Sequence, residues 1–412
     1  MRAHLSLALA VLGRRKVFTA ISLFGISMTL AVLLVITAIV DNLVTPGAPE
    51  SRFHRALTVS RIGQYGKGFT MTTDPGYGFL DRYVRTLPNI EKASIFTLLQ
   101  GTAVYRDGGR IDTMIKRTDG AYWQILDFKF VEGGPFSAQD DRAGRHVAVI
   151  NEDIREKLFD GKPAVGRTFN LEGREFRVVG VVPRVPFLRL SAYSQIWVPI
   201  GTLKSADYRN QITGNFQGVV LLRDRSDIPA VKREFQSRLP RVPLSDPKQF
   251  QSLKAGLDTP FEAFARMVTG GRPDSASPAR AVTILAVLAV MFMALPAMNL
   301  ITLNLSRILE RASEIGVRRA FGAPRGSLIR QFVFENVVIT VVGGLAGFIL
   351  AAALLPVLNE AAPVPDLRFS INLRVFAWGM FFAVFFGVFS GVYPAWKMSR
   401  LHPVNALRGG SQ

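Results

Sequence analysis

Cysteine is absent from the 412-residue sequence, and histidine occurs only four times. Without cysteine no disulfide can stabilise a domain, and the common zinc sites that combine cysteine with histidine are excluded. We interpret the histidines as ordinary surface or polar-contact residues, because they are scattered along the chain at His4, His54, His146 and His402. The sequence therefore predicts no metal site, and a folded domain must be stabilised by its own apolar core.

Motifs of nucleotide binding and of covalent catalysis are also missing. Neither Gly66-Lys67 nor Gly161-Lys162 has the upstream glycine and the following hydroxyl residue of a phosphate-binding loop. A Gly-x-Ser-x-Gly nucleophile elbow does not occur either. We expect no catalytic residue, no cofactor bound by this sequence and no intrinsic enzyme activity.

The sequence does contain four long apolar runs without a charged residue. Each can cross the hydrocarbon core of a bilayer, which needs about 20 helical residues. Continuous apolarity favours helices over barrel strands, in which apolar and polar residues alternate. The sequence therefore predicts four transmembrane helices, at residues 17–40, 281–306, 336–358 and 375–396.

The charges that flank these runs set the expected orientation. Residues 1–16, 307–335 and 397–412 are rich in lysine and arginine, which the positive-inside rule assigns to the cytoplasm. Residues 41–280 and the short loop 359–374 then lie outside. This topology, with contact to anionic lipid as a secondary explanation, accounts for the basic segments behind the net charge of +19 without nucleic-acid binding.

The sequence pattern of residues 41–280 is typical of a folded domain and not of a membrane segment. Short runs of β-forming residues alternate with Gly and Pro turns, and other stretches have apolar residues at helical spacing. We expect an α+β domain, with 257–278 as a return connection or as a short amphipathic helix. The expected strands are 56–62, 146–150, 175–182 and 195–199, and the expected helices are 78–87, 152–159 and 228–239.

No ionisable residue lies inside the four apolar runs. A proton or ion pathway through the bilayer would need such residues, so a secondary transporter or channel is disfavoured. The runs contain instead pairs of small residues at a spacing of four, which let helices approach closely. We expect these pairs to serve packing within the chain or a dimer contact: Gly343 with Gly347, and Gly387 with Gly391.

A charged segment follows the second run and shows helical spacing. Glu314 and Arg318 form an acid–base pair four residues apart in the favourable order, and Gly322-Ala323-Pro324 ends the element. The stretch from Glu310 to Ala323, the tail around Tyr393-Pro394-Ala395 and the motif around Glu132-Gly133 together resemble MacB/FtsX-type ABC transporter permeases. The three motifs occur in the order that this family requires.

The resemblance implies a four-helix permease of the bacterial inner membrane, with both termini cytoplasmic and a large periplasmic α+β domain between helices 1 and 2. It implies a separate cytoplasmic ATPase that binds ATP and Mg, a second permease copy or paralogue, and a periplasmic adaptor or substrate protein. It places the ATPase-coupling surface between the second and third helices, at Glu310, Arg311, Glu314, Ile315, Gly316, Arg318, Arg319 and Ala320.

The function implied by this resemblance is mechanotransmission. Motion of the ATPase would reach the periplasmic domain and drive export or release of a hydrophobic, peptide or lipidated substrate. Two alternatives stay open at this point: regulation of a periplasmic cell-wall hydrolase without transport, and a module for sensing or resisting antimicrobial peptides.

Overall fold

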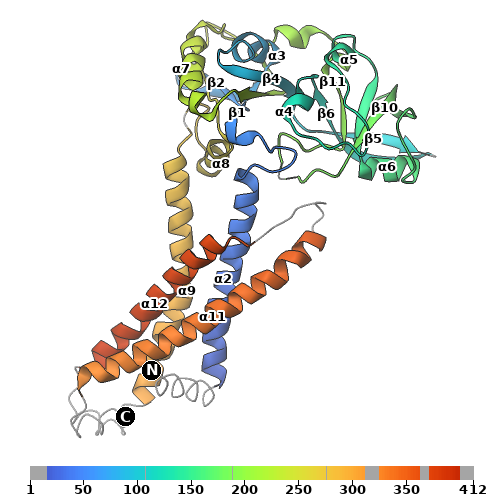
Figure 1. Cartoon of the computed structure of the whole chain (residues 1–412). Helices are drawn as coiled ribbons and strands as arrows, with labels where there is room; N and C mark the ends of the chain where they lie inside the picture. Colours follow the sequence, from blue (N-terminus) through green and yellow to red (C-terminus); the bar gives the residue numbers. More distant parts are fainter. Residues whose placement is uncertain are drawn as a thin grey trace. The chain divides into compact units, whose positions relative to one another are not determined.

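The computed structural model describes residues 16–106, 108–187, 189–274, 276–310, 324–361 and 371–399. They separate into two compact units, which are considered one at a time (Figure 1). The first is an α+β domain within residues 41–282. The second, here called the helical unit, contains the described residues before Asp41 and after Val282.

The α+β domain is built on a large sheet with the strand order β1-β13-β4-β6-β11-β8-β10-β9-β5, and β7 pairs with β10. Because β5 also pairs with β6, six of these strands close into a ring. The strands are β1 (Ala56–Val59), β4 (Ile90–Thr97), β5 (Gln100–Arg106), β6 (Gly109–Thr118), β7 (Glu132–Gly133), β8 (Val147–Asn151), β9 (Thr168–Leu171), β10 (Arg174–Val182), β11 (Ile196–Pro199) and β13 (Phe216–Leu222).

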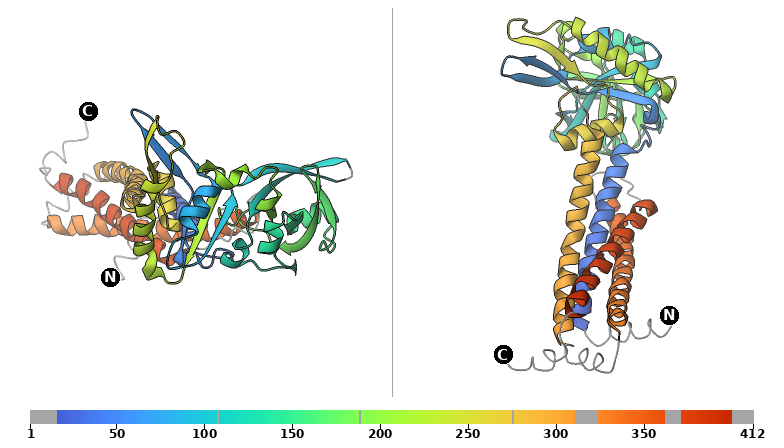
Figure 2. Two further views of the ribbon diagram at one scale, coloured as in Figure 1. Left: turned by 90° about the horizontal axis from the view of Figure 1, so that it is seen from above. Right: turned by 90° about the vertical axis from the view of Figure 1, so that its left-hand side faces the viewer.

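A smaller sheet has the order β12-β3-β2-β14. Its strands are β2 (Ile62–Gly66), β3 (Thr70–Pro75), β12 (Thr213–Gly214) and β14 (Phe250–Ala255). The prediction of one strand over 56–62 was therefore wrong, because β1 pairs with β13 of the large sheet whereas β2 pairs with β3 and β14. The small sheet and the β5–β6 hairpin project away from one another in the view from above (Figure 2).

Two of the longer helices of the α+β domain, α6 (Glu152–Phe159) and α7 (Ile228–Arg238), pack apolar residues into its cores. Helix α6 spans the predicted residues; the Asn151 side chain accepts from the Ile154 N–H at its start, and Asp160 ends it in the left-handed conformation. Its residues Ile154 and Leu158 belong to the same core as the ring strands. Helix α7 packs Val231 and Phe235 into a separate core beside β2 and β14.

The remaining helical segments are short. The predicted helix over 78–87 begins as α3 (Tyr77–Phe79) and continues as a π-helical turn, Leu80–Val84. The segment 257–278 contains the helix considered as an alternative, α8 (Pro260–Thr269), closed at its start by a Thr259–Glu262 capping box. The others are α4 (Tyr122–Ile125), α5 (Ala138–Arg142) and the 3-10 turns Phe53–Arg55, Ile200–Thr202, Asp207–Asn210, Arg225–Asp227 and Leu239–Arg241.

The helical unit contains long helices at the positions of the four apolar runs: α2 (Lys16–Val44), α9 (Pro278–Glu310), α11 (Arg325–Ala361) and α12 (Leu373–Ser399). Of the described helices, three are long and apolar enough to cross a membrane, over Thr19–Asn42, Pro278–Leu295 and Val333–Leu358. The apolar part of α12 is shorter, Leu373–Phe389. Helices α11 and α12 lie side by side (Figure 2).

Candidate functional site

The predicted ATPase-coupling residues lie almost entirely outside the described part of the chain. Glu310 is the last residue of α9, and α11 begins at Arg325. The other residues of the predicted surface fall between these helices, outside the described residues, so their role stays a prediction. They are Arg311, Glu314, Ile315, Gly316, Arg318, Arg319 and Ala320.

Three of the four glycines predicted for packing lie against another helix of the same chain. A Cβ added to Gly343 would lie 3.0 Å from Ile26 Cβ, and one added to Gly347 would lie 2.7 Å from the carbonyl oxygen of Ser27. Gly387 of α12 meets Thr340 of α11 in the same way. These glycines let α2, α11 and α12 approach closely. Gly391 lies in α12, and its surroundings fall outside the description.

The chain enters the α+β domain directly after α2, and buried charged side chains hold that segment. The Arg189 guanidinium donates to the carbonyl oxygen of Thr45 at 2.7 Å. The Glu50 carboxylate accepts from the backbone N–H groups of Ser191 and Ala192, both at 3.1 Å. Arg189 and Glu50 are both buried, so water is largely excluded from these bonds.

Lys116 of β6 completes this cluster. Its ammonium group donates to the carbonyl oxygens of Leu190 at 3.0 Å and Ser191 at 2.8 Å. Burial raises the pKa of Glu50 to about 7 and lowers the pKa of Lys116 to about 7, because both charged forms lose hydration. We call Glu50, Lys116 and Arg189 the first anchor, since together they fix residues 45–50 to the 189–192 loop.

A second buried cluster holds the chain where it leaves the domain, before α9. The Arg266 guanidinium donates to both carboxylate oxygens of Asp258, at 2.8 Å and 2.7 Å, and to the carbonyl oxygen of Arg272. Burial raises the pKa of Asp258, and the Arg266 charge opposes that rise. We call Asp258 and Arg266 the second anchor.

The second anchor is joined to the strand that follows the first. The backbone N–H of Thr58 donates to the carbonyl oxygen of Asp258, and the N–H of Asp258 donates to that of Thr58, both at 2.8 Å. Thr58 lies in β1, which pairs with β13 of the large sheet. Both connections to the membrane helices are therefore attached to the domain's own framework.

Comparison with known proteins identifies the family. Residues 19–238 match the MacB-like periplasmic core domain, and residues 286–403 match the FtsX-like permease C-terminal domain. The chain belongs to the MacB/FtsX family of ABC transporter permeases. The resemblance expected from the three sequence motifs is confirmed, as is the large α+β domain accompanied by apolar helices.

Relatives with known names are distant but cover most of this chain. The uncharacterized ABC transporter permease YknZ of Bacillus subtilis is 26% identical over 298 residues, which is 72% of this chain and 70% of YknZ. The macrolide export ATP-binding/permease protein MacB of Bdellovibrio bacteriovorus is 27% identical over 301 residues, or 72% of this chain and 44% of MacB. The chain thus spans less than half the length of that MacB.

Solved structures of similar domains are known. The periplasmic region of MacB from Actinobacillus actinomycetemcomitans is 14% identical, with a TM-score of 0.35 over 44% of this chain and 83% of that one. The extracellular domain of YknZ, from Gram-positive bacteria, is also 14% identical, with a TM-score of 0.34 over 48% of this chain and 97% of that one.

Proposed function

We propose that this chain is the permease subunit that transmits the motion of a separate cytoplasmic ATPase to its α+β domain. The motion would drive export or release of a hydrophobic, peptide or lipidated substrate on the outer side of a bacterial inner membrane. The ATPase role is assigned to a partner because these 412 residues contain no phosphate-binding loop. Helix α12 would be the fourth span, and both termini would be cytoplasmic.

The observation that carries this proposal is the pair of anchors on the segments that connect the α+β domain to α2 and α9. Removing one partner of a buried ion pair, such as Asp258 with Arg266 in the second anchor, costs about 3–5 kcal/mol, since a charge is left buried without compensation. In the first anchor, a displacement would break buried hydrogen bonds from Arg189 and Lys116 and to Glu50. A displacement of α2 or α9 would therefore carry the attached edge of the sheet with it before the anchors break. A flexible linker of solvated residues would absorb the same displacement.

The names of the relatives agree with separate roles for an ATP-binding part and a permease part. The MacB relatives are described as ATP-binding/permease proteins, so both roles occur within those chains. The matched part of each is about half its length. The two family models that match the present chain describe a periplasmic core domain and a permease C-terminal domain.

The proposal is tested with the full chain and its cognate ATPase in lipid nanodiscs. We expect the permease to co-purify with the ATPase and to raise its rate of ATP hydrolysis, and Arg318→Glu to abolish both effects. Arg330→Glu is the control. It makes the same change in charge at an exposed position of α11 that is not among the predicted coupling residues. Hydrolysis of ATP by the purified chain alone, or full stimulation by Arg318→Glu, would contradict the proposed coupling.

A further inference from the structure

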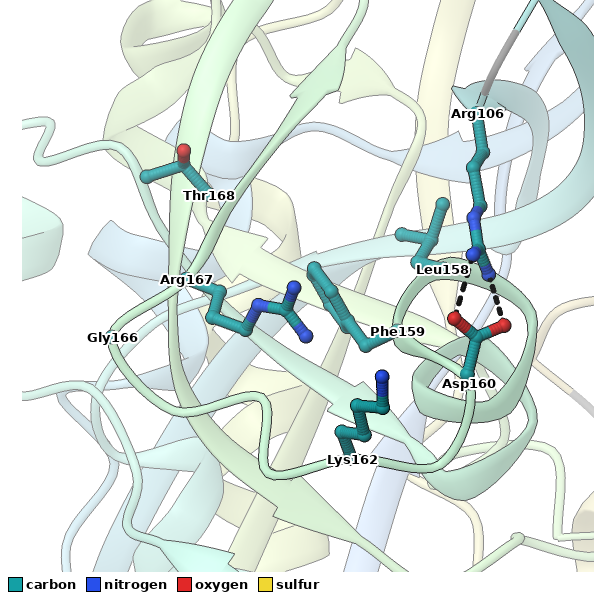
Figure 3. Close-up of a pocket in the computed structure, with 8 residues that line it drawn as sticks. All are labelled: Arg106, Leu158, Phe159, Asp160, Lys162, Gly166, Arg167 and Thr168. Carbon is teal, nitrogen blue, oxygen red and sulfur yellow. Dashed lines mark hydrogen bonds and ion pairs between the residues drawn. The ribbon is translucent and has the colours of Figure 1, made fainter.

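An open pocket of about 570 Å³ lies in the α+β domain, between the end of β5, the end of α6 and the turn that leads into β9 (Figure 3). Pockets of about 300–1,000 Å³ are the usual size for small-molecule sites. Neither anchor contributes to the lining, which consists of Arg106, Leu158, Phe159, Asp160, Lys162, Gly166, Arg167 and Thr168.

The base of the pocket is apolar and belongs to the domain core. Leu158 and Phe159 are buried and pack with residues of the ring strands. The Arg167 guanidinium carbon lies 4.8 Å from the centroid of the Phe159 ring, which holds that side chain over the aromatic face. Figure 3 shows Lys162 pointing toward the same ring from the other side of the turn.

The backbone that carries these cations is fixed by hydrogen bonds. The Gly166 N–H donates to the carbonyl oxygen of Val178 at 2.9 Å, and Gly166 adopts a φ of +88°, a conformation that favours glycine. The Arg167 N–H donates to Ala164, and its carbonyl oxygen accepts from the Val178 N–H at 2.9 Å. The position of Arg167 at the pocket is therefore set by β10.

The charges of the lining are not balanced. Arg106 binds the Asp160 carboxylate with two guanidinium nitrogens, each at 2.7 Å. Lys162 and Arg167 form no ion pair or side-chain hydrogen bond with any described residue. The hydrogen bond from Arg106 lowers the pKa of Asp160, and the positive charges of Lys162 and Arg167 lower it further. Three cationic side chains thus surround one carboxylate, an excess of two positive charges.

In a second pocket of the same domain, of about 500 Å³, two cationic side chains already have partners within the protein. Its Arg117 is paired with Glu172 at 2.7 Å, and its Arg174 donates to the carbonyl oxygen of Thr202 at 3.0 Å. Two of its cationic groups are thus already bonded to the protein. The donors of Arg167 and Lys162 in the first pocket are still open to a ligand.

We propose that the pocket formed by Arg106, Phe159, Lys162 and Arg167 binds a phosphate monoester. Such a group carries about −1.5 to −2 charges at pH 7 and three acceptor oxygens, which matches the excess positive charge. The planar guanidinium of Arg167 can donate two parallel hydrogen bonds to it, and the Lys162 ammonium supplies a point charge. Two sources share this chemistry: a soluble phosphate ester and the headgroup of a lipid such as phosphatidic acid.

The test is calorimetric titration of the full chain, in nanodiscs of phosphatidylcholine, with glycerol 1-phosphate. We expect saturable binding that weakens at least tenfold in the double variant Arg167→Gln, Lys162→Gln. The matched control, Arg233→Gln with Lys248→Gln, removes two positive charges from exposed positions outside the pocket and should bind like the unmodified chain. Equal elution volume and melting temperature of the variants establish that both are folded.

Absence of saturable binding, or equal weakening in the two double variants, would overturn the proposal. The source of the phosphate is then read from nanodiscs that contain phosphatidic acid. Loss of glycerol phosphate binding in these discs, but not in discs of equal total charge made with a phosphodiester lipid, identifies the lipid headgroup. Unchanged binding identifies a soluble ester.

Discussion

The α+β domain and the helical unit hold their elements together with opposite kinds of side chain. The domain fixes its connecting segments with buried charges, in the two anchors. The helical unit uses glycines, and its apolar runs contain no charged residue. A buried ion pair has one geometry and a high cost of breaking, whereas contacts between small residues and apolar chains have no directional bond to lose. We therefore expect the domain and its connections to resist displacement more strongly than the contacts between the helices.

The largest expected effect comes from breaking the second anchor. Arg266→Met leaves Asp258 buried without its partner, and we expect the free energy of unfolding of the α+β domain to fall by about 3–5 kcal/mol. The measurement is thermal unfolding of the full chain in detergent. Adding Asp258→Leu should recover most of the loss, because it removes the unpaired charge. A loss below about 1 kcal/mol for the single variant would mean that the anchor does not hold the segment.

The first anchor is tested by the dependence of folding stability on pH. Burial raises the pKa of Glu50 in the folded state from its usual 4.5 to about 7, so the folded state binds more protons than the unfolded state between these pH values. Stability from this group is therefore complete below about pH 4.5 and is lost as the pH rises toward 7, by roughly 3 kcal/mol. Glu50→Gln retains an acceptor oxygen for Ser191 and Ala192 and should remove this decline.

Lys116 makes folding stability change with pH in the opposite direction. Its folded pKa is lowered to about 7 from 10.5, so the unfolded state binds the extra proton and stability rises between these values. Lys116→Met should flatten this alkaline branch, while Glu156→Gln, at an exposed position, should change neither branch. Melting temperatures measured from pH 4 to 10 decide between these outcomes. If the melting temperature of Glu50→Gln still declines between pH 4.5 and 7, Glu50 is not the group responsible for the decline.

The smallest expected effect concerns the helices. Gly347→Leu places a side chain against the backbone of Ser27, and overpacking of this kind costs about 1–3 kcal/mol. Gly326→Leu lies in the same helix, where an added Cβ has no neighbour within 4 Å, and should cost less. Stability in detergent is compared for both variants. Equal effects would show that the close contact of α11 with α2 does not contribute to stability.

Local signals in the sequence predicted much of the fold. The helix over 152–159 was predicted at the observed bounds of α6, because the apolar spacing that indicates it, including Ile154 and Leu158, acts within a single helix. The split of 56–62 between two sheets could not be predicted, because Ser60 and Arg61 lie between strands whose partners come from distant parts of the chain. Spacing singled out Gly343, Gly347 and Gly387 as candidates for close packing, but the helix that each one contacts is a matter of tertiary structure.

The anchors were missed entirely. Lys116 is followed by Arg117 and Thr118, so a reader of the sequence would place this stretch at the surface, yet all three are buried. The carbonyl groups that bind the Lys116 ammonium lie 74 and 75 residues further along the chain. Such partners offset the free-energy cost of burying a charge, and no local sequence pattern predicts them.

The backbone pair between Thr58 and Asp258 closes a loop of 200 residues. During synthesis this loop stays open until Asp258 has been added, which is only about twenty residues before α9 begins at Pro278. At roughly 5–20 residues per second, a ribosome covers that distance in about one to four seconds. The domain is therefore completed at almost the same time as the apolar helix α9 is synthesised. A delay in closing the loop would leave the unfinished domain and α9 exposed together.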